Sequence, residues 1–414
     1  MTAHAHSHHT TWLLRRTSTS GPAGSYPPSP KPQGSLQNPS DPWHVPALAA
    51  LTPCIFTPEG QRWSAFLQRT RLGRRLVRLV FGDADKRYAR DCLRLPSTPS
   101  TRTPSANPSS GITTGLSALK PSRNAFWGAS SAGPASNPAI WPTLQSGAVQ
   151  IIRADLQRVV PEGLLLEDGT MLEAETIVCG TGWVPGVERV FGEELAQELG
   201  LRGAKGGEGG EWEEEDGRAR EYVLGRFPIL AEADPVGTGA VAEKQTAPYR
   251  LYRGIVPLAD PSHSIVFLGL VKIINSFRTS EVQALWASAY LDGSFHHPPS
   301  LPKTSKPSSP SPSAAPFWPD LAARRTDVAR CVQWSYLRYP DSRGKAGGLG
   351  MALDGLAYTG VLLRDLGLGS LEDGKSWWGS WIGLVWAGDL RGLVAEYRAK
   401  SQGACKACGI SWGL

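Results

Sequence analysis

The chain has 414 residues with a formal net charge of +6, and 41% of its residues are hydrophobic. This length suits two or three domains, but 46 glycines and 34 prolines predict that part of the chain is loop or disordered. The basic residues are scattered without a nucleic-acid-binding motif, and no run approaches the ~20 apolar residues of a membrane-spanning helix, which argues against both classes of protein.

The first folded element predicted is a short apolar strand, Trp12-Leu13-Leu14, followed by Arg15 and Arg16. A dinucleotide-binding domain places a basic residue after such a strand to bind the 2′-phosphate of NADP. Arginine suits this task because its planar guanidinium bonds phosphate in two places. Ordinary surface arginines are the alternative interpretation. Four nearby histidines lack carboxylate or cysteine partners, so we predict no metal site at His4, His6, His8 and His9.

Segments dense in proline and serine interrupt the chain at 18–40, 94–112 and 296–316. Their composition cannot bury enough apolar surface to offset the entropy of ordering, so we expect linkers or long surface loops. Residues 203–217 mix glycine with the acidic run Glu213-Glu214-Glu215. We expect a solvated loop there and no metal site.

Residues 62–81 show the period of an amphipathic helix. One face is predicted to carry Phe66, Thr70, Gly73, Val77 and Val80, and another carries Arg71, Arg74, Arg75 and Arg78. The pattern favours a helix packed on its domain with a basic face in solvent. A helix that binds a membrane surface or an acidic partner stays open as the alternative.

The region 146–183 predicts a compact unit of strands. Residues 148–153 form one strand, and two short runs flank Asp168-Gly169, whose glycine permits the positive φ of a tight hairpin turn. Residues 176–179 predict a short buried strand that runs into Gly180-Thr181-Gly182. Because glycine has no Cβ, such a strand end lets the ribose or pyrophosphate of a cofactor approach the backbone closely.

Downstream, the apolar run 265–268 predicts a strand buried on both faces that ends at Gly269. Thr279 and Ser280 then cap a predicted helix. Its apolar face is expected to carry Val282, Leu285, Trp286, Ala289 and Tyr290. Tryptophans beyond residue 370 predict a helical C-terminal region.

These segments follow one another as they do in the flavin-containing monooxygenases, and the chain resembles the fungal FAD- and NADPH-dependent branch of that family. The resemblance implies an α/β protein with two doubly wound dinucleotide-binding domains. It also implies FAD and NADP as cofactors, and a small organic substrate that is oxygenated with O2. The matching stretches are 11–16, 69–74, 146–149, 168–170, 177–183, 251–257, 267–270 and 281–286.

The resemblance also assigns roles to particular residues. Gly180, Thr181, Gly182 and Trp183 would lie near the FAD, and Gly269 would end the strand that leads to its ring system. A helix starting at Ser280 would point its N-terminus at the pyrimidine side of the ring. Arg15 and Arg16 would bind NADP. No side chain is assigned as a catalytic acid or base, because in this chemistry the flavin carries the reaction.

The sequence departs from the family because no Gly-x-Gly-x-x-Gly stands between a strand and a helix. We therefore expect an incomplete two-dinucleotide-binding-domain fold that lacks the N-terminal FAD-binding part. The alternative is a non-catalytic remnant or interaction protein that binds no flavin. The expected division is a remnant of the NADPH domain at 1–17, a Pro/Ser-rich segment at 18–61, a helical segment at 62–93, a loop at 94–125, the C-terminal parts of both cofactor domains at 126–293, a linker at 294–316 and a helical region at 317–414.

Six cysteines are spread widely over a chain with no secretory signal. This usage favours a reducing compartment, so we expect a cytoplasmic protein without disulfide bonds.

Overall fold

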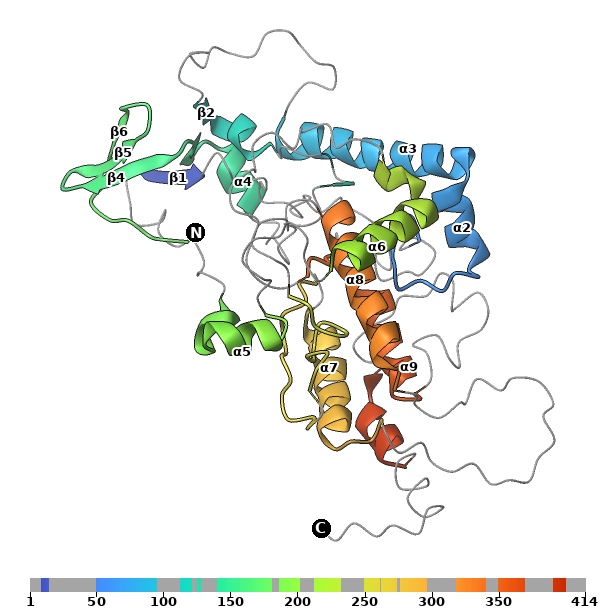
Figure 1. Cartoon of the computed structure of the whole chain (residues 1–414). Coiled ribbons are helices and arrows are strands. Elements are labelled where there is room, and N and C mark those ends of the chain that lie inside the picture. Colours follow the sequence, from blue (N-terminus) through green and yellow to red (C-terminus); the bar gives the residue numbers. More distant parts are fainter. Residues whose placement is uncertain are drawn as a thin grey trace, which may run out of the picture. The chain divides into compact units, whose positions relative to one another are not determined.

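The chain forms two compact units, seen in a computed structural model (Figure 1). The first, here called the sheet unit, comprises Met1–Ser40, Arg75–Pro185 and Asp234–Gly239, and the second, the helical unit, comprises Asp41–Arg74, Gly186–Ala233 and Ala240–Leu414. The residues that the structure describes are 9–14, 50–94, 112–120, 124, 126–127, 140–180, 186–201, 212–231, 249–260, 262–273, 276–295, 318–339, 349–368 and 390–399. The predicted Pro/Ser-rich segments 18–40 and 296–316, and nearly all of 94–112, lie outside them.

The sheet unit contains a three-stranded mixed sheet in the order β1-β3-β2. Strand β1 (Thr10–Leu14) runs parallel to β3 (Val149–Arg153), and the short β2 (Thr113–Thr114) pairs antiparallel with β3. Successive side chains of a strand point to opposite faces. Ile151 accordingly packs in a core cluster with Tyr88 and Trp141, whereas Ile152 packs with Leu166. The central strand is thus buried on both faces, and the predicted strands at 12–14 and 148–153 are confirmed.

An antiparallel sheet in the order β4-β5-β6 follows at once. It is built from β4 (Leu156–Val160), β5 (Gly163–Leu166) and β6 (Met171–Glu173). Gly169 adopts φ +86°, and the Asp168 carboxylate accepts the Thr170 N–H at 3.1 Å. These features confirm the predicted hairpin turn.

The predicted strand at 176–179 is wrong. These residues form no strand, and the side chains of Ile177 and Val178 are 41% and 87% exposed. A strand requires a neighbour to satisfy its backbone hydrogen bonds. No strand among the described residues pairs with this segment, so its apolar composition does not suffice.

The helix predicted over 62–81 is broken at Thr70 into α2 (Arg62–Arg69) and α3 (Arg71–Arg87), and a π-helical turn, η3 (Tyr88–Cys92), follows. Thr70 begins the second helix, because its Oγ1 accepts the N–H of Gly73 at 3.0 Å. Gly73 and Val77 are buried as predicted, but Thr70 and Val80 are exposed. Phe81 takes the buried position that was predicted for Val80.

Gly73 is the residue that lets α3 approach α2 closely. A Cβ at Gly73 would lie 2.6 Å from Leu67 Cα, which is backbone and cannot yield. Gly73→Ala should therefore lower the free energy of unfolding by about 1–3 kcal/mol in urea titrations. Gly82 lies in the same helix, and a Cβ at its position would meet nothing within 4 Å. Gly82→Ala should stabilise the protein by about 1 kcal/mol, and equal effects of the two substitutions would contradict the close approach.

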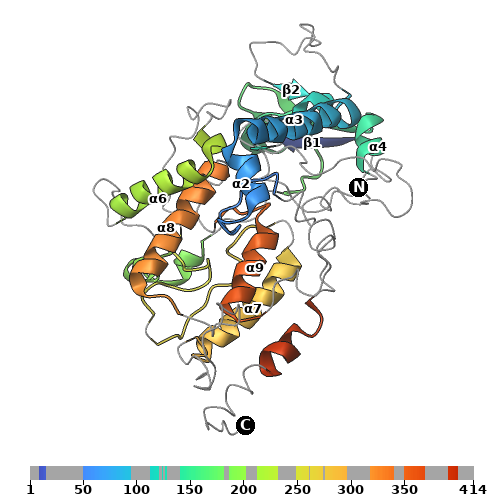
Figure 2. The same ribbon diagram turned by 90° about the vertical axis from the view of Figure 1, so that its right-hand side faces the viewer.

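The helical unit is built on four longer helices (Figure 2). Helix α6 packs against α8, and α7 packs against α9. Helices α8 and α9 lie within the range 317–414 that was expected to be helical, but the tryptophans beyond residue 370 on which that expectation rested lie outside the described residues. The bounds are α6 (Glu213–Arg226), α7 (Ser276–Leu291), α8 (Leu321–Arg338) and α9 (Gly355–Asp365).

Short helices complete both units. The sheet unit contains η4 (Gly115–Leu119) and α4 (Ile140–Gln145). The helical unit contains η6 (Val187–Val190), α5 (Glu193–Glu198) and η7 (Pro228–Ala231). None of the helices in the described part of the chain is long and apolar enough to cross a membrane.

The acidic run Glu213-Glu214-Glu215 lies in the first turn of α6 and is not part of a loop, which corrects the expectation for this segment. Negative charge is favourable there because the N-terminus of a helix carries a partial positive charge. The run also has tertiary partners that the sequence does not reveal. Glu215 pairs with Arg325 at 3.2 Å, and the neighbouring Asp216 pairs with Arg250 at 2.6 Å.

Candidate functional site

The predicted cofactor-binding residues fall in both units. Gly180 is exposed and belongs to the sheet unit, whereas Gly269 and Ser280 belong to the helical unit. The other predicted positions lie outside the described residues, namely Arg15, Arg16, Thr181, Gly182 and Trp183.

Gly269 offers open backbone to an incoming group. It is exposed, adopts φ +76°, and a Cβ built on it would meet nothing within 4 Å. The predicted strand before it is wrong, because residues 265–268 form no strand. A backbone bond from the N–H of Phe267 to the carbonyl of Ile255, at 2.7 Å, holds the segment, and Leu268 is exposed.

Helix α7 begins at Ser276, one turn earlier than predicted. Thr279 is buried inside the helix, where its hydroxyl hydrogen-bonds that of Thr359 on α9 at 3.2 Å, and Ser280 is exposed. The cap expected at these two residues is therefore wrong, because packing against α9 extends the helix. The predicted apolar face is confirmed: Val282, Trp286, Ala289 and Tyr290 are buried, and Leu285 packs against the same core.

The segment between Gly269 and α7 is hydrogen-bonded to the residues that precede α9. The N–H of Lys272 donates to the carbonyl of Leu349 at 2.9 Å, and the N–H of Met351 donates to the carbonyl of Lys272 at 3.0 Å. Gly355 opens α9 directly beside Ile273, whose Cγ2 would lie 2.5 Å from a Cβ at that position. The absence of a side chain at Gly355 therefore allows this junction.

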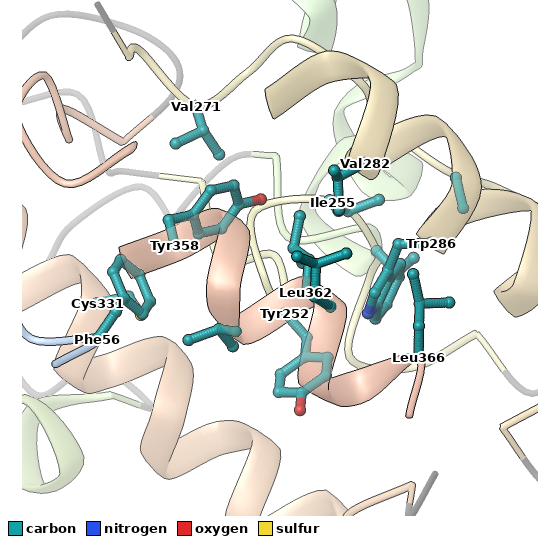
Figure 3. Close-up of a cluster of buried hydrophobic side chains, with 14 of the residues drawn as sticks. Phe56, Tyr252, Ile255, Val271, Val282, Trp286, Cys331, Tyr358, Leu362 and Leu366 are labelled. Atoms are coloured by element: carbon teal, nitrogen blue, oxygen red, sulfur yellow. The ribbon is translucent and has the colours of Figure 1, made fainter. Parts of the chain in front are cut away.

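A core of aromatic and aliphatic side chains lies between α7 and α9 (Figure 3). Val282 and Trp286 project from α7 toward Leu362 of α9 and Leu366, which directly follows that helix, and Tyr252 enters from the loop 249–260. All five side chains are buried. This core holds α7, and with it the neighbourhood of Gly269, in place.

Arg253 is a buried cation that sequence reasoning missed, although it lies in the matching stretch 251–257. Its guanidinium binds Asp365 through two hydrogen bonds of 2.8 and 3.1 Å, and it binds Asp327 at 2.7 Å. Burial by itself would lower the pKa of Arg253, but the charges of Asp365 and Asp327 outweigh it and raise the pKa. The indole N–H of Trp286 also donates to Asp365, at 3.1 Å. The Arg253 side chain therefore links the loop 249–260 to α8, through Asp327, and to α9, through Asp365.

Removal of Asp365 should strongly destabilise the helical unit. Asp365→Ala leaves a guanidinium that is 14% exposed with one carboxylate and leaves the Trp286 N–H without its acceptor. We expect a loss of about 3–5 kcal/mol in the free energy of unfolding, measured by tryptophan fluorescence in urea. Glu214 forms an exposed pair with Arg218 at 3.2 Å in the same unit, so Glu214→Ala should cost less than about 1 kcal/mol. A comparable loss in both variants would show that the buried pair has no special role.

Asp354 is the most deeply buried carboxylate described, and it too was missed. It accepts the indole N–H of Trp334 at 2.7 Å and the hydroxyl of Tyr339 at 3.1 Å. Burial raises its pKa, against the opposing effects of the Trp334 bond and the charge of Arg338. Burial likewise raises the pKa of the neighbouring Cys54 thiol, and the charge of Asp354 adds to the rise. A thiol in this state is a poor nucleophile.

The raised pKa of Asp354 predicts a pH dependence of stability. A carboxyl whose folded pKa exceeds its ordinary value of 3.8 contributes more stability below that value than above the folded pKa. Wild-type protein should therefore lose stability relative to Asp354→Asn as the pH rises from about 4 to about 8. Urea titrations of both proteins across this range measure the difference, and a difference that does not change with pH would refute the prediction.

Within the described residues, no group of three or more His, Cys, Asp or Glu side chains is placed to hold a metal ion. Cys54, Cys179 and Cys331 are free thiols.

The chain is similar to curated fungal enzymes. It is 29% identical over 282 residues to the FAD-dependent monooxygenase rstn6 of Aspergillus nomiae, an alignment that covers 66% of this chain and 44% of that enzyme. It is 26% identical over 290 residues to the FAD-dependent monooxygenase resA of Aspergillus sclerotiorum, covering 67% and 45% of the two chains. The chain is related to the fungal FAD-dependent monooxygenases.

Other relatives support the same assignment. An FAD-dependent monooxygenase of Pyrenophora dematioidea is 26% identical over 255 residues, covering 59% of this chain and 41% of that enzyme. The chain spans less than half the length of these curated FAD-dependent monooxygenases. No family model and no solved structure matches it. The family resemblance read from the sequence is thus confirmed.

Proposed function

We propose that this chain is part of an FAD-dependent monooxygenase that uses NADPH and O2 to oxygenate a small organic substrate. The observation that carries the proposal is the similarity to FAD-dependent monooxygenases over two thirds of the chain. FAD would supply the oxygen chemistry when bound. The protein's part is to bind the cofactor, to orient the substrate and to exclude water.

The residues around Gly269 fit a dinucleotide cofactor. The open backbone at Gly269 accommodates the close approach of a flat or anionic group. The first turn of α7 contains no acidic residue, so the partial positive charge of the helix N-terminus favours negative charge nearby. Ser280 adds an exposed hydroxyl to the same helix. Separately, and on the family resemblance alone, we propose Gly180, Thr181, Gly182 and Trp183 of the sheet unit as flavin-binding residues.

A doubly wound NADPH-binding domain is the finer proposal for the sheet unit. The parallel pairing of β1 with β3 supports it, because parallel strands distant in sequence are the basis of such domains. Arg15 and Arg16 directly follow β1 and bind the 2′-phosphate of NADP in this proposal.

Flavin content tests the proposal directly. The purified full chain, incubated with FAD and freed of unbound cofactor, should retain the visible absorption of flavin and should lose it on addition of NADPH under nitrogen. The competing candidate is a remnant that binds no flavin, which the lack of a Gly-x-Gly-x-x-Gly loop favours. A folded, colourless product after incubation with FAD would decide for the remnant.

A matched pair of variants tests the role of Gly269. Gly269 and Gly169 both have positive φ, and neither has an atom within 4 Å of a would-be Cβ. Alanine at either position should therefore cost a similar ~1 kcal/mol of stability. Gly269→Ala should in addition lower the amount of FAD retained, whereas Gly169→Ala should not. Equal FAD retention by the two variants would remove Gly269 from the cofactor site.

A further inference from the structure

Helix α3 carries two apolar faces, of which one packs inside the sheet unit. Val77, Phe81 and Tyr88 are buried. Phe81 contacts the ring of Phe126 edge-on at 5.3 Å, and Tyr88 contacts Trp141 in the same way at 6.0 Å. These contacts bury one face of the helix, which includes Val77 of the predicted face but not Val80. They leave the second apolar face unexplained.

The second face is exposed. Leu76, Leu79 and Val80 are spaced three and four residues apart, so they lie on one side of the helix. Their exposed fractions are 38%, 70% and 39%. Asp83 continues this side at the next turn, where it pairs with Arg87 at 2.7 Å. The exposed apolar stripe therefore ends where a neutralised ion pair begins.

Basic side chains flank this stripe. Arg75 and Lys86 are exposed and lie on the side of the helix next to Leu79, and α3 as a whole contains six basic and two acidic residues. Leucines beside arginines on one helix suit the boundary between lipid headgroups and acyl chains. Arginine can keep its guanidinium hydrated among lipid phosphates while its methylenes cover apolar surface, whereas a dry protein interface would strip that hydration.

We propose that α3 is a docking helix for an anionic lipid surface. Leu76, Leu79 and Val80 enter the headgroup boundary, and Arg75 and Lys86 contact lipid phosphates. The assignment is independent of flavin binding. It places the protein beside a membrane, where lipophilic small molecules concentrate.

Vesicle sedimentation tests the proposal with the full chain. The protein should sediment with phosphatidylcholine vesicles that contain phosphatidylserine, and sodium chloride should weaken the binding because it screens surface charge. Leu79→Ser should lower the partition coefficient about tenfold. Arg75→Gln and Lys86→Gln should each lower it about fivefold. Thermal unfolding of each variant checks that it remains folded.

The control is Val159 of β4, which is 60% exposed in the same unit. Val159→Ser should leave vesicle binding unchanged. Equal losses in Leu79→Ser and Val159→Ser would overturn the assignment to α3. Equal binding to vesicles without phosphatidylserine, or binding to polyglutamate in place of vesicles, would overturn the assignment to anionic lipid.

Discussion

The pairing of Arg253 with Asp365 and Asp327 is the interaction on which the helical unit depends. One guanidinium joins the loop 249–260 to α8 and α9, and Trp286 ties α7 to the same carboxylate. A buried charge is tolerated when its partners are placed to meet it, and loss of one partner leaves the other uncompensated. The hydroxyl of Tyr358 adds a 2.6 Å bond to the backbone carbonyl of Arg253. These contacts fix the loop 249–260, which precedes Gly269 in the chain.

The position of the loop 249–260 matters for the proposed function, because the groups proposed to face the cofactor are the backbone at Gly269 and the N-terminus of α7. Phe267 is bonded to Ile255 of the supported loop, and Lys272 is bonded to the segment that precedes α9. Gly269 lies between these two attachments. In the function proposed above, the flavin carries the reaction and the protein supplies a fixed, accessible surface for it. The buried state of Cys54 and Asp354 agrees with this, since neither is exposed for chemistry.

In the sheet unit, some of the apolar side chains are exposed. Its central strand β3 is covered on both faces, yet the segment after the hairpin leaves Ile177 and Val178 in solvent. Both the exposed segment and the exposed stripe of α3 are apolar surfaces that the described residues do not cover. The first suits backbone pairing with another strand. The second combines leucine with arginine, which suits a charged lipid surface better than the interior of a protein.

The sequence by itself determined the features that rest on local interactions. The Asp168-Gly169 turn follows from the φ that glycine permits, and the buried face of α7 follows from its period of apolar residues. The order of matching segments also sufficed to predict the similarity to FAD-dependent monooxygenases that the comparisons show. Tertiary structure decided the rest. Residues 176–179 and 265–268 have strand-like composition but form no strand. The backbone hydrogen bonds of a strand come from another part of the chain, and composition does not reveal whether that partner is present.

The break at Thr70 and the start of α7 at Ser276 depend on the contacts of Gly73 and Thr279 with neighbouring helices. Arg253 could not be recognised as buried from its own sequence, because its two carboxylates lie 74 and 112 residues away.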